Sequence, residues 1–260
     1  MLMPPLIDTH CHLDFPVFDG QHRALLSRCA RLSVARIVIP AVIADHWPRL
    51  MQLADMHEPL LPALGLHPCF VEHHLPDHLL ELESLLAERR VCAVGEIGLD
   101  LWHGDSTLKQ QSEYFEAQLA LAERFQLPVL LHVRKAHEQT IALLRRRSFT
   151  QGGIVHAFSG SQQQAERYLE LGFCLGVGGG VTYPRARKLR RTLAAMPDDA
   201  LVLETDAPDM PLCGYQGQPN SPEKLPEVLQ ALAEVCQRPA EQLAEQLWRN
   251  SCRVLRLEAA

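Results

Sequence analysis

Long apolar runs are missing from this 260-residue sequence. No stretch of 18 or more apolar residues occurs, so we expect no transmembrane helix. The first five residues have no basic region and no long apolar stretch, which argues against a signal peptide and favours a cytoplasmic protein. The eight cysteines form no Cys-x-x-Cys pair, so we expect reduced thiols rather than disulfides.

A strong excess of charge of one sign is also missing. The net charge of −6 argues against a protein that coats nucleic acid electrostatically, although it is compatible with an enzyme that grips a few phosphates. No Gly-x-Gly-x-x-Gly follows the first apolar run, so a dinucleotide site has no support. No linker-like or low-complexity stretch interrupts the chain. We therefore expect one domain over residues 1–260, without an obligate protein partner.

What the sequence does have is a repeating pattern of short apolar runs. The eight runs are 6–12, 36–42, 60–66, 91–98, 128–133, 153–158, 173–178 and 201–206. Each is typical of a parallel strand buried on both faces, and segments with helical spacing, such as 114–125 and 225–236, lie between them. Eight strand–helix repeats in about 250 residues predict an α/β fold of the TIM (β/α)8 barrel type. A doubly wound open sheet is the alternative.

Polar residues at the ends of these runs are the candidate functional residues. They are His10, His12, Glu96, His132, His156 and Asp206. Each alone has an ordinary explanation, such as a hydrogen-bonded core histidine or a turn-forming aspartate. The carboxyl ends of barrel strands converge on one face, however, and the longest expected loop, 207–226, would lie there too. Unpaired burial of six such groups would cost several kcal/mol, so the set predicts a metal centre.

The number of candidate ligands favours two metal ions. Six ligands exceed the three or four protein ligands of one catalytic zinc. Glu96 is the carboxylate best placed to bridge two ions. Nitrogen and oxygen ligands without thiolate suit Mg, Mn or Zn, and the sequence does not choose among them. Two such ions can activate water and clamp a phosphoryl group.

Seven motifs occur in an order that points to a known family. They are Asp8-Thr9-His10-Cys11-His12-Leu13-Asp14, Gly65-Leu66-His67-Pro68, Gly95-Glu96-Ile97-Gly98-Leu99-Asp100, His132-x-Arg134, His156-Ala157-Phe158-Ser159-Gly160, Glu204-Thr205-Asp206-Ala207-Pro208 and Asn250-Ser251-x-Arg253. The chain resembles the TatD family of metal-dependent deoxyribonucleases, and its YjjV-like hydrolases in particular, from end to end.

The resemblance implies a TIM barrel of the metallo-dependent hydrolase type with deoxyribonuclease-type activity. It implies that one divalent ion is held by His10, His12, Glu96 and Asp206, and a second by Glu96, His132 and His156. Asp206 would orient or deprotonate the attacking water, with Glu96 and His156 completing the catalytic set. Expected substrates are DNA ends, oligonucleotides or a small phosphoester.

The resemblance also places Arg134 and His67 near the substrate phosphate. Each has an alternative, since Arg134 could pair with a carboxylate and His67 could cap the third strand. The acidic residue often found after the His-x-Arg motif is replaced by Lys135. This lysine could add a positive charge near the mouth of the site or begin a solvent-facing helix, and the second interpretation is favoured. Tyr183 could stack on a base, but packing against its own loop is favoured.

Two other functions compete with the nuclease interpretation. Amidohydrolase-type barrels, which cleave amides or esters such as lactones, share the His-x-His opening and the eighth-strand Asp. Their two-metal members usually bridge the ions with a modified Lys on the fourth strand, whereas no Lys lies in 91–100 and Glu96 occupies that strand. A metal-binding protein without activity is disfavoured because all six ligand positions are intact.

Overall fold

A computed structural model describes residues 3–258 of the chain. Its single sheet contains eight parallel strands in the order β1 to β8. The strands are β1 (Leu6–Asp8), β2 (Val34–Pro40), β3 (Leu60–Leu64), β4 (Ala93–Asp100), β5 (Val129–Arg134), β6 (Gly153–Val155), β7 (Phe173–Val177) and β8 (Leu201–Leu203). The predicted TIM-barrel fold is confirmed, and the open doubly wound sheet is excluded.

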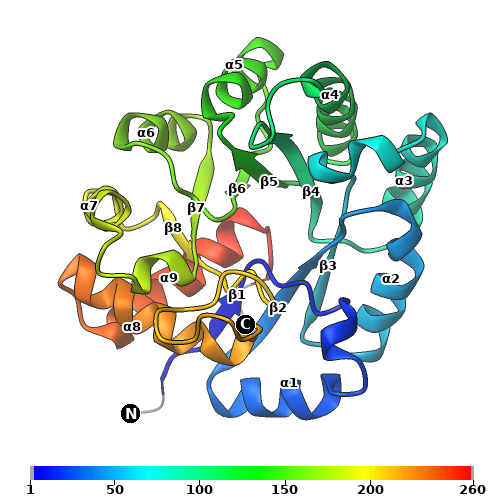
Figure 1. Cartoon of the computed structure of the whole chain (residues 1–260). Helices are drawn as coiled ribbons and strands as arrows, with labels where there is room; N and C mark the ends of the chain where they lie inside the picture. The colour runs from blue at the N-terminus through cyan, green and yellow to red at the C-terminus, as the bar shows by residue number, and fades with distance from the viewer. Residues whose placement is uncertain (1–2, 259–260) are drawn as a thin grey trace.

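Helices follow the strands and surround them, as Figure 1 shows. They are α1 (His22–Arg31), α2 (Trp47–Met56), α3 (Pro76–Glu88), α4 (Leu108–Arg124), α5 (His137–Arg147), α6 (Gln162–Glu170), α7 (Arg187–Ala194), α8 (Leu225–Cys236) and α9 (Ala240–Val254). The predicted segment 225–236 coincides with α8, which begins beside a proline and ends where Gln237 adopts a left-handed conformation. Among residues 3–258, no helix has the length and apolar character to cross a membrane.

The seam between β8 and β1 nearly closes the barrel. Thr9 donates its backbone N–H to Leu203 O at 2.9 Å, and Cys11 forms a parallel bridge with Ala207. Asp8 strengthens the seam from inside, because its carboxylate accepts the Thr205 N–H at 3.0 Å and the Thr205 hydroxyl at 2.6 Å. The first and last strands are thereby held in register next to the candidate ligands.

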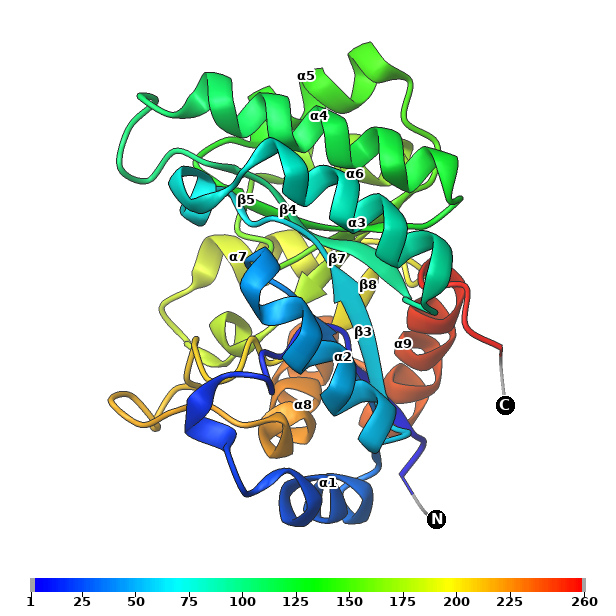
Figure 2. The same ribbon diagram turned by 90° about the vertical axis from the view of Figure 1, so that its right-hand side faces the viewer.

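Apolar side chains fill the barrel below the level of these ligands. One buried residue from each of seven strands joins two residues from the C-terminal end of the chain: Val38, Ala63, Ala93, Leu130, Ile154, Cys174, Val202, Val254 and Leu255. Their strand neighbours pack outward against the helices in a second, larger cluster. Helix α9 covers the end of the barrel where the strands begin (Figure 2). The candidate ligands lie at the opposite end.

Three strands are shorter than predicted by three residues or more. The runs 6–12, 153–158 and 201–206 continue past the last paired residues, Asp8, Val155 and Leu203. The chain leaves the extended conformation there, since Ala157 and Asp206 both have positive φ angles of 42° and 58°. His10, His12, His156 and Asp206 therefore follow their strands, and the strict alternation expected for the pair His10 and His12 does not describe their backbone.

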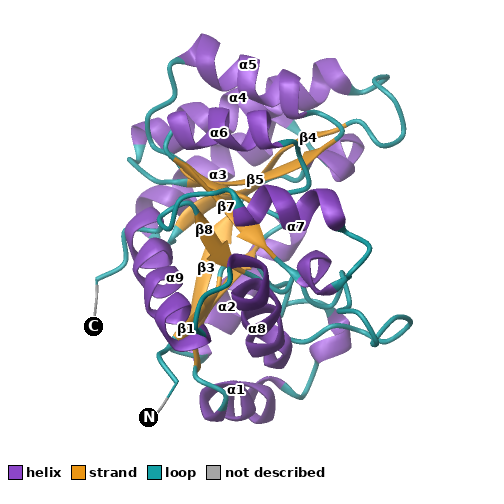
Figure 3. Cartoon of the chain, turned by 90° about the vertical axis from the view of Figure 1, so that its left-hand side faces the viewer, coloured by secondary structure: helices purple, strands orange, loops and turns teal. Residues whose placement is uncertain are grey.

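The loop after β8 lies at the carboxyl end of the barrel, as predicted. Figure 3 shows it on the side opposite to both ends of the chain. Asn220 ties this loop down, because its amide donates to Thr205 O at 2.8 Å and to Met210 O at 3.2 Å. The last part of the predicted loop is instead a short 3-10 helix, Pro222–Lys224, that leads into α8.

A glycine in β4 sets how closely this strand approaches β5. Gly98 pairs with His132 and has a φ of +143°. A Cβ atom at this position would lie 2.1 Å from His132 O. Only glycine therefore fits here without displacing the backbone that carries one of the candidate ligands.

We predict that Gly98→Ala destabilises the protein by about 1–3 kcal/mol more than Gly104→Ala, because the added methyl group must push β4 and β5 apart. Gly104 is a matched control: its φ is also positive, at +104°, but no atom lies within 4 Å of the position that its added methyl group would take. Denaturant unfolding of both variants measures the difference. Equal destabilisation would show that close strand packing at His132 is unimportant.

Candidate metal centre

Four donor atoms from three strand ends converge on one side of Glu96. His10 Nε2 lies 3.1 Å from Glu96 Oε2 and 3.9 Å from Asp206 Oδ1. His12 Nε2 lies 3.7 Å from the same Glu96 oxygen and 3.8 Å from the same Asp206 oxygen. Ligands at about 2.0–2.1 Å from a tetrahedral ion are about 3.3 Å apart, so these four atoms could surround one ion.

The second oxygen of Glu96 faces a different group of imidazoles. Oε1 lies 2.9 Å from His132 Nδ1, 3.2 Å from His67 Nε2 and 3.8 Å from His156 Nε2. Glu96 itself is 2% exposed and comes from the middle of β4. One buried carboxylate thus separates two sets of donors, each facing one of its oxygens.

His156 lies between the two groups. Its Nε2 is 3.7 Å from Asp206 Oδ2, and its ring stacks on the ring of His10 with centroids 3.7 Å apart. Cation-binding groups can be formed from His10, Glu96 and His156, and from His10, His12 and Asp206. The donors are nitrogen and carboxylate oxygen, which suit Zn and Mn, and a cation would compensate the burial of so many polar groups.

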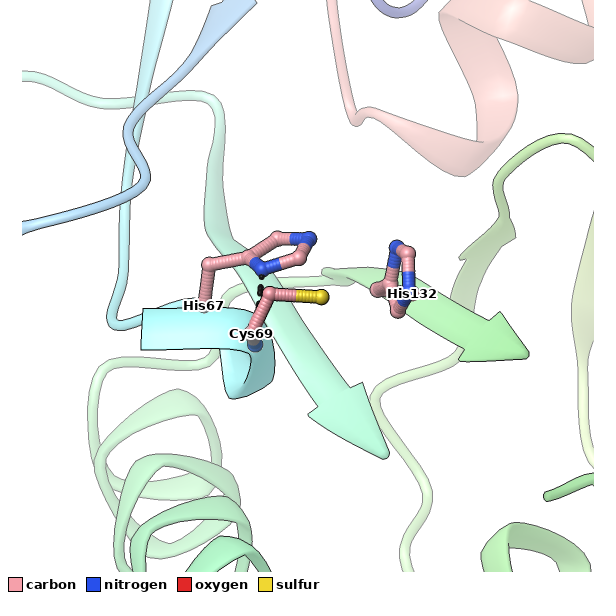
Figure 4. Close-up of side chains that lie close together, drawn as sticks. All are labelled: His67, Cys69 and His132. Atoms are coloured by element: carbon pink, nitrogen blue, oxygen red, sulfur yellow. Dashed lines mark hydrogen bonds between the residues drawn. The ribbon is translucent and has the colours of Figure 1, made fainter. Parts of the chain in front are cut away.

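A third group lies beside the second set and includes a residue that the sequence did not single out. His67, Cys69 and His132 bring two ring nitrogens and a sulfur within 4.8 Å of one another (Figure 4). The Cys69 N–H donates to His67 Nδ1 at 3.1 Å, so His67 caps the 3-10 helix Pro68–His73 while its Nε2 faces Glu96. His67 therefore caps this 3-10 helix rather than β3, and its ring lies beside Glu96.

Two further acidic residues support the ligands and were also missed. Asp100 Oδ2 lies 2.8 Å from His132 Nε2. Glu204 Oε1 lies 3.2 Å from His156 Nδ1 and accepts the Ala157 N–H at 2.6 Å. Carboxylates behind imidazole ligands fix ring orientation and raise ligand basicity. Both acids belong to the sequence motifs that contain the candidate ligands. Their closeness in sequence to Glu96 and Asp206 could have identified them.

The remaining sequence candidates lie outside the donor groups. Arg134 is exposed, and its Cζ lies 4.0 Å from the centroid of the Trp102 ring. The alternative that Arg134 pairs with a carboxylate is not seen within residues 3–258. Lys135 lies over the same ring at 4.2 Å and precedes α5, which begins at His137. Tyr183 donates its hydroxyl to Pro211 O at 2.7 Å, which favours the packing interpretation.

The imidazoles differ in how readily they bind a proton. Burial lowers the pKa of the His12 imidazole to about 4, and it lowers the pKa of His10 as well. Burial also opposes protonation of His156, but the nearby carboxylates, with Asp206 foremost, outweigh it and raise its pKa to about 10. Burial raises the pKa of the Asp206 carboxyl to about 7. His10 and His12 are therefore neutral at pH 7, whereas His156 holds a proton.

We predict that metal binding at pH 7 releases at least about one proton per molecule, because a ligating His156 must be neutral. The affinity should consequently rise with pH below about 10, where the metal-free imidazole is still protonated. Calorimetric titration of chelator-treated protein with Mn²⁺, in buffers of different ionisation enthalpy, measures the proton count. His156→Gln should release fewer protons. Heats that do not depend on the buffer would contradict the prediction.

Comparisons with known proteins agree with this fold and donor set. The model of the family described as TatD related DNase matches residues 7–256. The uncharacterized metal-dependent hydrolase YjjV of Escherichia coli K12 is 47% identical over 247 residues, which cover 94% of this chain and 95% of that protein. A crystal structure of YjjV superimposes with a TM-score of 0.92 and 46% identity, covering 96% of this chain and 97% of that one.

A second relative has a more specific name. The 3'-5' ssDNA/RNA exonuclease TatD of Rahnella is 34% identical over 223 residues, covering 83% of this chain and 85% of that protein. The family match extends over nearly the whole barrel and includes every candidate ligand. The chain belongs to the TatD family of metal-dependent hydrolases.

Proposed function

We propose that this hydrolase is a nuclease that cleaves phosphodiester bonds at DNA ends or in oligonucleotides with two divalent ions. The observation that carries the proposal is the Glu96 carboxylate, whose two oxygens face separate donor groups at 2.9–3.8 Å. The family description and the Rahnella exonuclease support nucleic acid as the substrate.

In this proposal, each ion has its own ligand set and the two sets share Glu96. His10, His12 and Asp206 would hold one ion together with Glu96, and His132 and His156 would hold the other with the same carboxylate. Mg, Mn or Zn fits these nitrogen and oxygen donors. When bound, such ions lower the pKa of water and neutralise negative charge on the phosphoryl oxygens.

The chain's own groups would position the reactants and move the proton. Asp206 accepts the proton of the attacking water, because its carboxylate lies within 3.9 Å of both His10 Nε2 and His12 Nε2 and so borders the first donor group. His156 Nε2 lies 3.7 Å from the other Asp206 oxygen, and Glu204 Oε1 lies 3.2 Å from His156 Nδ1. His67, with its Nε2 3.2 Å from Glu96 Oε1, and Arg134, exposed at the end of β5, bind the substrate phosphate in this proposal.

An amide or lactone hydrolase is the alternative function for the same centre. Against it stands β4 itself, because two-metal amidohydrolases usually bridge their ions with a modified lysine on this strand. The strand Ala93–Asp100 contains no lysine, and Glu96 takes the bridging position. A phosphodiester and a lactone tested on the same metal-loaded protein separate the two functions.

The eight free thiols suggest that the protein resides in a reducing compartment. None of the eight cysteines forms a disulfide, and Cys11, Cys29, Cys174 and Cys252 are buried. Structural disulfides are rare in the cytosol and common outside it. We therefore include a cytoplasmic location in the proposal.

We predict that Asp206→Asn lowers kcat for a single-stranded oligonucleotide by about 10²–10⁴-fold, because the amide cannot accept the proton of water. Steady-state assays with added Mg²⁺, Mn²⁺ or Zn²⁺ measure the loss. Asp77→Asn is the control, since this exposed residue lies in the first turn of α3 and outside both donor groups, and it should retain activity. An Asp206→Asn protein with full activity would remove this residue from the mechanism.

A second prediction concerns metal content. We expect Glu96→Gln to lose both ions. Loss of a residue that only hydrogen-bonds to a metal ligand lowers metal affinity by about 10–100-fold, and loss of a shared ligand should lower it further. Metal analysis after equilibrium dialysis gives the stoichiometry, and Glu166→Gln, an exposed position on α6, is the control. Retention of one ion at unchanged affinity would mean that Glu96 serves a single site.

A further inference from the structure

A tryptophan in the loop after β4 lies at the mouth of the site and has no role in the centre. Trp102 is 48% exposed, which is unusual for so large an apolar side chain. Its backbone N–H donates to Asp100 Oδ1 at 2.8 Å, and the preceding Leu101 N–H donates to Arg134 O at 2.9 Å. Backbone hydrogen bonds therefore hold this exposed ring at the ends of β4 and β5.

Two cationic side chains lie over the Trp102 ring. Arg134 Cζ is 4.0 Å and Lys135 Nζ is 4.2 Å from the ring centroid. Cation–π contacts hold both groups in place, yet neither makes an ion pair within residues 3–258, although the whole chain is acidic. Two uncompensated positive charges on one ring attract an anion, and the part of the indole that these two contacts leave exposed can receive a flat ring.

The cluster of Trp102, Arg134 and Lys135 adjoins the centre directly. Asp100, which anchors the Trp102 backbone, contacts His132 Nε2 at 2.8 Å and is paired with Arg134 across the sheet. His132 and Arg134 are alternate residues of β5, so their side chains leave the strand on one face, about 7 Å apart along the chain. Figure 2 shows the β4–α4 loop on the same side of the barrel as the loop after β8.

We propose that Trp102, Arg134 and Lys135 form a subsite for the nucleotide next to the scissile phosphate. Trp102 stacks on the base. Arg134 binds the scissile phosphate, as in the proposed function, and Lys135 binds the phosphate next to it. Stacking on a side chain needs an unpaired base, so the subsite selects single-stranded nucleic acid. The inference rests on the proposed nuclease function. The name of the Rahnella relative already specifies single strands, and the inference adds the residues that recognise them.

Two substrates separate this role from a structural one. Trp102→Ala should lower kcat/KM for an oligothymidylate by about 5- to 100-fold, mainly through KM, because one stacking contact is lost. Bis(p-nitrophenyl) phosphate has no neighbouring nucleotide, so its kcat/KM should fall far less. Trp102→Phe should restore part of the oligonucleotide activity. Leu80→Ala, at another exposed apolar residue, is the control. Equal losses on both substrates, or none on the oligonucleotide, would overturn the proposal.

Salt dependence tests the two cations. Each phosphate contact to a single strand contributes about 0.7 to the slope of log affinity against log salt concentration. Arg134→Ala and Lys135→Asn should each flatten this slope for the oligothymidylate, and asparagine suits the left-handed backbone of Lys135. Lys109→Asn, at a residue paired with Glu113 on α4, should leave the slope unchanged. Unchanged slopes in both Arg134→Ala and Lys135→Asn would overturn phosphate binding by these cations.

Binding measured without turnover distinguishes failure of the subsite from failure of the nuclease function. Fluorescence anisotropy of a labelled oligothymidylate reports its affinity for Asp206→Asn protein, with and without Trp102→Ala. A 5- to 100-fold weaker affinity in the double variant supports the subsite, even if the wild-type protein hydrolyses no phosphodiester, and equal affinities overturn it. Absence of hydrolysis by wild-type protein with Mg²⁺, Mn²⁺ and Zn²⁺ refutes only the nuclease function.

Discussion

The carboxylate of Glu96 is the constraint on which the site depends. It is buried in β4 and faces imidazoles on both sides, with His10 3.1 Å from one oxygen and His132 2.9 Å from the other. A charged group is stable at such a position only if positive charge surrounds it on both sides. A protonated His156 supplies part of that charge, but His10 and His12 are neutral, so a cation in their donor group would supply the charge on that side.

The rest of the barrel holds this arrangement at its carboxyl end. Asp8 and Thr205 join β1 to β8, so His10 and Asp206 approach from a seam that is hydrogen bonded from inside. Gly98 lets β4 approach β5 closely, and Asp100 braces His132 from behind. Helix α9 and the apolar interior close the other end. The residues that stabilise the barrel and the candidate metal ligands thus lie at opposite ends of one sheet.

The sequence predicted the fold and the residues that converge, because parallel strands are apolar throughout and bring their carboxyl ends to one face. It overestimated β1, β6 and β8, where the chain turns away before the polar residues. It also missed Asp100 and Glu204, since an acidic residue after a strand looks like a turn former until its partner imidazole is located. Only the folded backbone brings Cys69 beside His132.

Anomalous diffraction from crystals soaked in Mn²⁺ tests the central claim most directly, because it locates each ion independently of activity. The account predicts two peaks about 3.5–4 Å apart. One should lie beside each oxygen of Glu96, the first with His10, His12 and Asp206 and the second with His132 and His156. A single peak, or two peaks too far apart to share the Glu96 carboxylate, would contradict it.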